Sequence, residues 1–169
     1  PFLESVRRPA RAEFGLPESG LVLLYVGRLG PEKNLTFLLR AFAAALAACP
    51  DLILALAGSG PELDNLRHQA QKSGISERVF FLGMVPYPEL PGVLALADVF
   101  VTASVTEVHP LSVIEAFAAG LPVMGIESPG VGDIVQDGAN GFLAQEDLAA
   151  FTARLVRLVL DEDLRRRLA

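Results

Sequence analysis

Six short apolar runs alternate with longer helical segments along this chain, and this alternation limits its possible folds more than any other feature. Runs that are apolar on both faces are typical of strands in a parallel sheet that helices cover on both sides. The segments between the runs are rich in Ala and Leu, which favour helices. The expected strands cover residues 21–26, 52–57, 79–82, 99–102, 122–126 and 141–144. The expected helices cover residues 35–48, 61–73, 88–97, 111–119 and 131–136, followed by a helical tail over 146–168.

This repeated strand–helix alternation predicts an α/β fold, a Rossmann-like doubly wound parallel sheet with right-handed crossovers. The length of 169 residues fits one domain, which we place at residues 19–169. Residues 1–18, with three arginines and three prolines, are interpreted as a lead-in outside the core. The chain starts without Met and ends in Arg165-Arg166-Arg167-Leu168-Ala169 without a helix cap, so we expect it to be a piece of a longer protein.

The composition excludes several classes of protein. The formal net charge of −6 argues against a nucleic-acid-binding module, which usually carries a basic face. Cys49 is the only cysteine, so no internal disulfide is possible and the chain suits a reducing cytoplasm. No apolar run approaches the roughly 18 residues of a membrane-spanning helix, and the N-terminus is not a signal peptide. We therefore expect a cytoplasmic protein and leave peripheral membrane association of the full-length protein open.

The loops that follow the expected strands hold the Gly, Pro and polar residues, and parallel strands bring these loops to one edge of the sheet. Arg28 and Lys33, in the loop after the first strand, are the only Arg or Lys in the loops after the first five strands. A guanidinium and an ammonium beside a helix N-terminus form an anion site, and a diphosphate suits it. The alternative is a surface Arg and Lys, with Glu32 pairing locally.

The loop after the fourth strand brings two carboxylates toward the same edge. Glu107 lies in the loop, Pro110 stands where a helix should begin, and Glu115 follows within that helix among apolar neighbours. A carboxylate in such a run is costly unless something pairs with it. Glu115 would then accept either a salt bridge or two hydroxyls of a ligand, and Glu107 would do the same for a second sugar. His109 is interpreted as a general base, a donor to developing charge, or a residue that fills the loop.

Other motifs are interpreted as structural. Gly58-Ser59-Gly60-Pro61 is a tight strand-to-helix turn, and it lacks the spacing of a dinucleotide fingerprint. The acids at 161–163 open the last helix, where negative charge complements the helix dipole. The two histidines and the cysteine share no metal-ligand spacing, so no metal and no other cofactor is expected.

Several motifs, taken together in order, resemble the retaining glycosyltransferases of family 4, from about residue 15 to the end of the chain. They are Gly27-Arg28-Leu29-x-x-Glu32-Lys33-Asn34, Gly58-x-Gly60-Pro61, Glu107 with seven residues before Glu115, Glu115-Ala116-Phe117-Ala118-Ala119-Gly120-Leu121-Pro122-Val123, and Asp137-Gly138-x-Asn140-Gly141-Phe142. Each motif alone is weak, but their order and spacing are specific.

The resemblance implies the donor-binding half of a two-lobed GT-B enzyme of the hexosyltransferase type, with the acceptor held by a missing N-terminal half. It implies that Arg28 and Lys33 hold the diphosphate of a UDP-, GDP- or ADP-linked sugar without a metal, and that Glu107 contacts the donor sugar. The remaining substrate-binding positions that it implies are Glu115 at the ribose, the backbone near Val85 at the base, Gly27 in the first loop, and the amides of Leu111 and Ser112 at the distal phosphate or sugar. Without the other half, the domain is expected to be inactive.

One stretch departs from the family pattern. Relatives often have a Gly-Phe-Gly-like loop after the first Glu, where this chain has Val108-His109-Pro110. Pro110 donates no N–H, so one backbone contact to the ligand is lost, unless His109 replaces it or the sugar sits differently. Two other readings are a half of a nucleotide-sugar epimerase or glycosyl phosphorylase, which the spacing of the two glutamates disfavours, and a non-catalytic docking domain.

Overall fold

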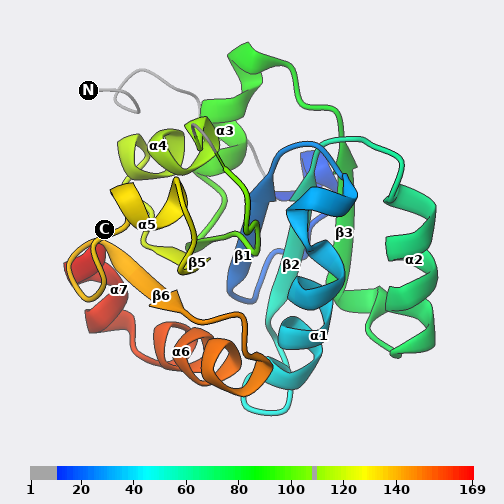
Figure 1. Cartoon of the computed structure of the whole chain (residues 1–169). Coiled ribbons are helices and arrows are strands. Elements are labelled where there is room, and N and C mark those ends of the chain that lie inside the picture. Colours follow the sequence, from blue (N-terminus) through cyan, green and yellow to red (C-terminus); the bar gives the residue numbers. More distant parts are fainter. Residues whose placement is uncertain (1–10, 108–109) are drawn as a thin grey trace.

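A computed structural model of the chain describes residues 11–107 and 110–169. It has one six-stranded parallel sheet in the order β3-β2-β1-β4-β5-β6 (Figure 1). The strands are β1 Val22–Val26, β2 Ile53–Ala57, β3 Val79–Gly83, β4 Val99–Val101, β5 Val123–Ile126 and β6 Gly141–Ala144. The α-helices are α1 Leu35–Ala45, α2 Leu63–Lys72, α3 Leu90–Leu94, α4 Leu111–Ala118, α5 Val131–Ile134, α6 Leu148–Leu160 and α7 Glu162–Leu168. Short 3₁₀ turns are η1 Arg11–Phe14, η2 Pro31–Lys33, η3 Ser76–Arg78 and η4 Tyr87–Glu89.

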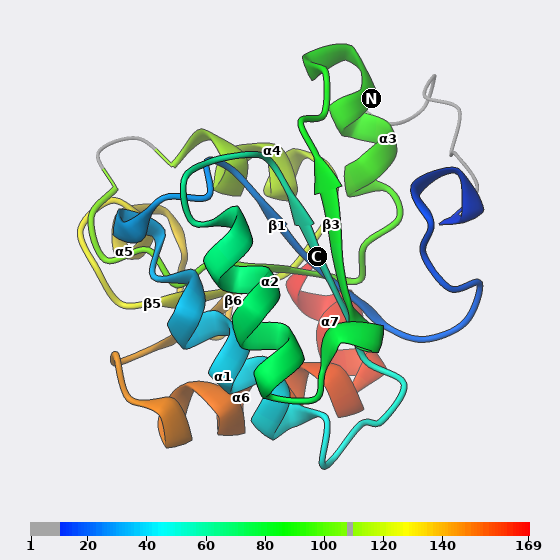
Figure 2. The same cartoon turned by 90° about the vertical axis from the view of Figure 1, so that its right-hand side faces the viewer.

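Helices cover both faces of the sheet, which explains why its strands are apolar throughout (Figures 1 and 2). Along β1, Leu23 and Tyr25 enter a cluster with residues of α1, α2, α6 and α7, whereas Val22 and Leu24 enter a second cluster with residues of α3, α4 and α5. This alternation follows from the two-residue period of a strand. The prediction of a doubly wound α/β fold is confirmed.

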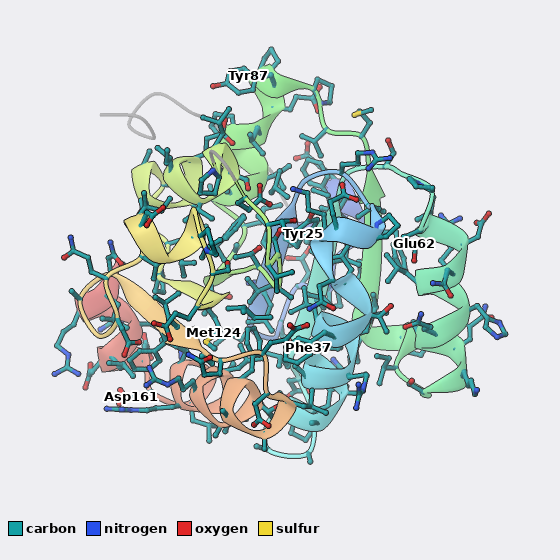
Figure 3. The ribbon with its side chains drawn as sticks, viewed as in Figure 1. Tyr25, Phe37, Glu62, Tyr87, Met124 and Asp161 are labelled. Carbon is teal, nitrogen blue, oxygen red and sulfur yellow. The ribbon has the colours of Figure 1, made fainter. Side chains whose placement is uncertain are left out.

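The first cluster shows how the connections pack. Phe37 of α1 meets Phe151 of α6 edge to face, with ring centroids 5.3 Å apart. Such aromatic pairs add stability beyond the area that they bury. Met124 of β5, labelled with Phe37 in Figure 3, is fully buried in the same cluster. Helices that follow distant strands therefore share one core.

The expected elements are all present, with three differences. The helical tail is two helices, because Asp161 adopts an extended conformation and its side chain accepts a hydrogen bond from the amide of Leu164. Such an N-cap starts a new helix, so the acids at 161–163 do open the last helix, as expected. The second difference concerns the bounds of two helices, since the expected helix 88–97 is divided between η4 and α3 and the expected helix 131–136 ends at Ile134.

The third difference lies in the expected lead-in. Leu16 is buried in the second cluster, so the core reaches back beyond residue 19. Arg11 holds this segment in place, because its guanidinium donates to the carbonyl of Gly20 at 2.7 Å and lies 3.6 Å from the carboxylate of Asp98. Residues 1–10 lie outside the described part of the chain.

Candidate functional site

The order of the strands selects one point on the edge of the sheet. β1 and β4 are neighbours, but the chain leaves β1 toward β2 and leaves β4 toward β5, in the opposite direction. The loops after these two strands therefore diverge and open a crevice, which is where doubly wound sheets bind ligands. Arg28 and Lys33 lie in the first loop and Glu107 in the second, so the candidate residues sit at this switch point.

A cavity of about 410 Å³ lies in this crevice, and we call it the charged pocket. It brings together residues from β1, η2, η4, β4's loop and α4. Its lining includes seven of the nine predicted site residues, namely Gly27, Arg28, Lys33, Glu107, Leu111, Ser112 and Glu115. The structure thus brings these seven residues together at one edge of the sheet.

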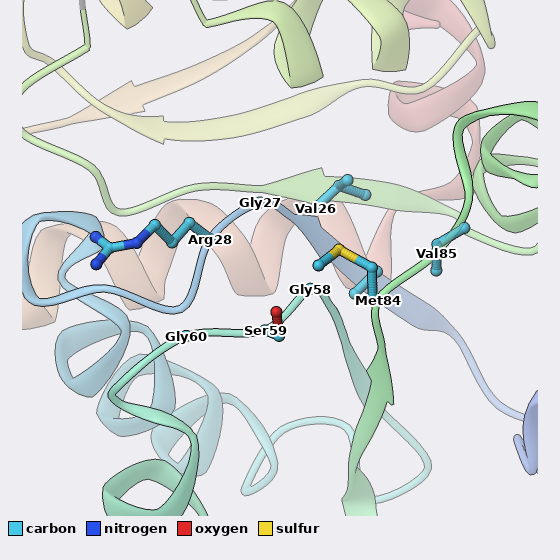
Figure 4. A pocket seen from close by; sticks show the side chains of 9 residues that line it. Val26, Gly27, Arg28, Gly58, Ser59, Gly60, Met84 and Val85 are labelled. Atoms are coloured by element: carbon cyan, nitrogen blue, oxygen red, sulfur yellow. The ribbon is translucent and has the colours of Figure 1, made fainter.

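A second cavity of about 480 Å³ adjoins the first, and we call it the apolar pocket. It is lined by Val26, Gly27, Arg28, Ala57, Gly58, Ser59, Gly60, Met84 and Val85 (Figure 4). Val85, the eighth predicted residue, lies here beside the exposed side chain of Met84. Because Val26, Gly27 and Arg28 line both cavities, the two pockets form one cleft. The ninth predicted residue, His109, lies outside the described residues, as does Val108.

Lys33 and Glu107 form an ion pair across the charged pocket. Their Nζ and Oε1 atoms are 2.6 Å apart, and the two side chains are only 18% and 19% exposed. A half-buried pair with a charge-assisted hydrogen bond is stronger than an exposed one. The sequence predicted separate contacts for this cation and this acid, and the structure couples them.

Arg28 has a more open environment, with its side chain 59% exposed. Its Nη1 lies 2.8 Å from Oε1 of Glu32, so the local pairing considered as an alternative does occur. A hydrogen bond from the backbone amide of Glu32 lowers the pKa of the Glu32 carboxyl, desolvation opposes this, and the hydrogen bond and charge of Arg28 lower the pKa further. Arg28 thus lines the cleft, while one N–H group of its guanidinium donates to the carboxylate of Glu32.

Glu115 projects from α4, which begins directly after Pro110 as predicted. Its side chain is half-buried, so the desolvation cost expected from its apolar neighbours is smaller than the sequence suggested. Among residues 11–107 and 110–169, no hydrogen bond or ion pair is formed by its carboxylate. Both carboxylate oxygens are therefore available on the wall of the charged pocket.

The glycine turn after β2 is structural, as interpreted from the sequence. Gly58 has a φ of +144°, and a Cβ atom there would lie 1.8 Å from the carbonyl oxygen of Gly27. The turn also supports the first loop, because the amide of Leu29 donates to the carbonyl of Ser59 at 2.9 Å. The absence of a side chain at Gly58 lets the loops after β1 and β2 touch.

Sequence reasoning missed several residues that line the cleft, among them Tyr25, Thr102 and Tyr87. Tyr25 and Thr102 belong to apolar runs and were assigned to the core, which is where both side chains are buried. The sequence feature that could have identified these two residues is a hydroxyl group at or beside the carboxyl ends of β1 and β4. Tyr87 is exposed at the outer rim (Figure 3).

Within the described ranges, no three His, Cys, Asp or Glu side chains gather in a way that suits a metal ion. The helices of the same part of the chain are too short or too polar to cross a bilayer.

Comparisons with known proteins agree on one family. The family Glycosyl transferases group 1 matches residues 6–169. The chain is 37% identical over 164 residues to D-inositol 3-phosphate glycosyltransferase of Corynebacterium jeikeium, which covers 92% of this chain and 39% of that protein. It is 34% identical over 163 residues to GDP-mannose-dependent alpha-(1-6)-phosphatidylinositol monomannoside mannosyltransferase of Mycolicibacterium smegmatis, covering 92% and 42% of the two chains.

A solved structure gives the same result for the fold. Anabaena Alr3699/HepE in complex with UDP and glucose superposes with a TM-score of 0.83 at 25% identity, covering 94% of this chain and 43% of that one. The chain thus spans about two fifths of the length of these relatives.

Proposed function

Since this chain belongs to the family Glycosyl transferases group 1, we propose that it is the donor-binding half of a retaining glycosyltransferase. The enzyme would move a sugar from a nucleoside diphosphate to an acceptor held by a second half. The observation that carries this proposal is the cleft at the switch point, where two cations and two carboxylates line one cavity beside an apolar one.

The two pockets match the two ends of a nucleotide sugar. The apolar pocket, with Val85 and Met84, suits the flat base, and Glu115 at the wall of the charged pocket suits the ribose hydroxyls because an ionised carboxylate accepts two hydrogen bonds. The diphosphate then lies against Arg28 and Lys33. The first amides of α4, at Leu111 and Ser112, have no partner within the helix and face the distal phosphate or the sugar.

The chemical step follows from this placement. As the bond between the anomeric carbon and the diphosphate oxygen breaks, its electron pair moves to that oxygen, and the negative charge grows where Arg28 and Lys33 stand. Fixed positive groups stabilise such a developing charge, and the loss of one typically costs about 3–4 kcal/mol of transition-state stabilisation. The acceptor hydroxyl attacks the same carbon on the face from which the diphosphate departs, and its proton passes to the departing diphosphate oxygen, so the configuration is retained.

The Lys33–Glu107 pair adds a condition to donor binding. The diphosphate shares Lys33 with Glu107. This is possible because the ammonium group has three N–H donors and its hydrogen bond to Glu107 uses one of them. Glu107 then remains beside the sugar, where its contact is proposed.

The proposed compartment is the cytoplasm, which the single cysteine supports.

One relative is named for GDP-mannose and the solved structure holds UDP, so experiment decides the nucleobase of the donor. A thermal-shift panel of UDP-, GDP- and ADP-linked sugars would select among them, because a ligand that binds only the folded state raises its stability.

Calorimetry with UDP, GDP and ADP tests the proposal itself. We expect one of these nucleotides to give binding heat, and we expect that heat to disappear in the double variant with Arg28→Ala and Lys33→Ala. Arg40→Ala is a matched control, because Arg40 is exposed on α1 and does not line the cleft. Absence of binding at millimolar concentrations of all three would favour a non-catalytic docking domain instead.

A further inference from the structure

The hydroxyl of Tyr25 lies directly beneath the loop that carries Arg28 and Lys33. The side chain is buried at the carboxyl end of β1, only 3% exposed, within the cluster that α1 covers (Figure 3). Its Oη donates a hydrogen bond of 3.0 Å to the backbone carbonyl of Arg28. A polar group at this depth therefore contacts the loop through its backbone.

Two further observations concern the hydroxyl of Tyr25, namely the space around it and its protonation. A Cβ atom on Gly27 would lie 2.7 Å from Oη of Tyr25, so the glycine leaves the space that the hydroxyl fills. Burial raises the pKa of the Tyr25 phenol well above its usual value, and the negative charges of Glu107 and Glu32 raise it further. The phenol consequently keeps its proton and remains a donor at any physiological pH.

Ser104 provides a second hold on the same loop. It is fully buried after β4, and its Oγ donates to the carbonyl of Glu32 at 3.4 Å. Its own carbonyl accepts a hydrogen bond of 3.0 Å from Oγ of Ser128. The loop is thus fixed at the carbonyl of Arg28 and at the carbonyl of the residue before Lys33.

We propose that Tyr25 is a positioning residue for the two cations, and that Ser104 assists it. Fixing the backbone at both carbonyls keeps Arg28 and Lys33 on the same wall of the cleft before a ligand arrives. Without these two hydrogen bonds, the loop would become ordered only during binding, and the entropic cost of ordering it would lower the affinity. The inference rests on the proposed function, since it assigns a diphosphate to these cations.

Phosphate-dependent affinity is the property that tests this role. In Tyr25→Phe, which keeps the ring, we expect the affinity for the preferred nucleoside diphosphate to fall roughly three- to tenfold, as for one hydrogen bond. Affinity for the matching nucleoside, measured by ligand-observed NMR, should not change, because a nucleoside lacks the diphosphate that the two cations are proposed to hold. Ser104→Ala should show the same selective loss to a smaller degree and serves if Tyr25→Phe does not fold.

The matched control is Thr152→Val. Thr152 lies on α6, away from the cleft, and its buried hydroxyl has no hydrogen-bond partner in the described part of the chain. Removal of this hydroxyl should alter neither affinity.

A double-mutant cycle separates a positioning role from a general loss of stability. If Tyr25 acts through Arg28, Tyr25→Phe should cost less than about twofold in an Arg28→Ala background, because coupled residues are not additive. Equal losses for nucleoside and nucleoside diphosphate, or no loss for either, would overturn the inference while the proposed function stands. No binding of any nucleoside diphosphate by the unaltered chain would overturn both.

Discussion

Lys33 and Arg28 carry the same charge, but their surroundings differ, and their contributions should differ too. Lys33 is 18% exposed and Arg28 is 59% exposed. Water screens an exposed charge, so the half-buried amine should interact more strongly with a diphosphate. We expect Lys33→Ala to weaken binding of the nucleoside diphosphate roughly 10- to 100-fold, and Arg28→Ala less than about tenfold. Calorimetric titration of the single variants at one salt concentration checks this order, which an equal or reversed loss would contradict.

Glu107 offers a second test at the scale of one residue, because it holds Lys33 in the free chain. Glu107→Gln removes the ion pair and a negative charge beside the diphosphate. We expect the free nucleoside diphosphate to bind about two- to tenfold more tightly to this variant, since a charged hydrogen bond no longer competes for Lys33. The intact nucleotide sugar should not gain, because it loses the contact proposed for Glu107.

The control for that experiment is Glu77→Gln, which changes an exposed carboxylate in η3, before β3 and therefore at the opposite edge of the sheet. Weaker binding of the nucleoside diphosphate to Glu107→Gln would show that Glu107 orients Lys33 instead of competing for it.

At the scale of elements, the contact between the loops after β1 and β2 depends on Gly58. A methyl group there meets the carbonyl oxygen of Gly27 and demands an unfavourable backbone conformation. We expect Gly58→Ala to lower the free energy of unfolding by more than about 2 kcal/mol in urea titrations. Gly132→Ala, in α5 with open space around it, should instead stabilise by about 0.5–1 kcal/mol. Similar effects of the two substitutions would contradict this account of the turn.

Asp137 connects α6 to the segment before β6, and this link should respond to pH. Partial burial opposes ionisation, but the hydrogen bond from the amide of Leu143 and the ion pair with Arg154 outweigh it, so the pKa of Asp137 is lowered. A lowered folded pKa gives stability that is present above the unfolded pKa of about 3.9 and is lost as pH falls through the folded value.

Asp137→Asn should therefore cost up to about 1 kcal/mol at pH 7, since the pair is half-exposed, and progressively less below about pH 4. Urea unfolding at several pH values measures the difference, with Asp64→Asn, an almost fully exposed acid on α2, as the control. A difference that persists unchanged at pH 3 would show that the charge of Asp137 is not its cause.

Most elements could be predicted from the sequence because the apolar pattern that places them is local. The apolar pattern alone could not show the break at Asp161, which only the acids at 161–163 indicated, or the burial of Leu16, which depends on Arg11 and Asp98. Residues of the cleft were predictable because parallel strands end at one edge. The pairing of Lys33 with Glu107 and the role of Tyr25 were not, because both arise from contacts between segments that only the folded chain brings together.

At the scale of the whole molecule, we propose that one half of the enzyme binds the donor and the other half binds the acceptor. The described cleft contains groups for a donor, and the chain spans about two fifths of its relatives. Closure of two lobes excludes water and completes such a site. We expect the preferred nucleotide sugar to stabilise this chain by about 2.7 kcal/mol at a hundredfold excess over its dissociation constant, without measurable transfer. Turnover by this chain alone, assayed as release of nucleoside diphosphate in the presence of candidate acceptors, would refute the division.

The wall of Val26, Gly27 and Arg28 that separates the two cavities has a practical consequence for inhibitor design. Small fragments that occupy the cavities one at a time would lie on either side of a single backbone segment. A short, stiff tether over Gly27 would then join them at high effective concentration, so that two weak fragments yield one tight compound. Because the base is proposed to lie next to Met84 and the diphosphate beside Lys33, the fragment next to Met84 could be varied by itself, without a change at the anionic end.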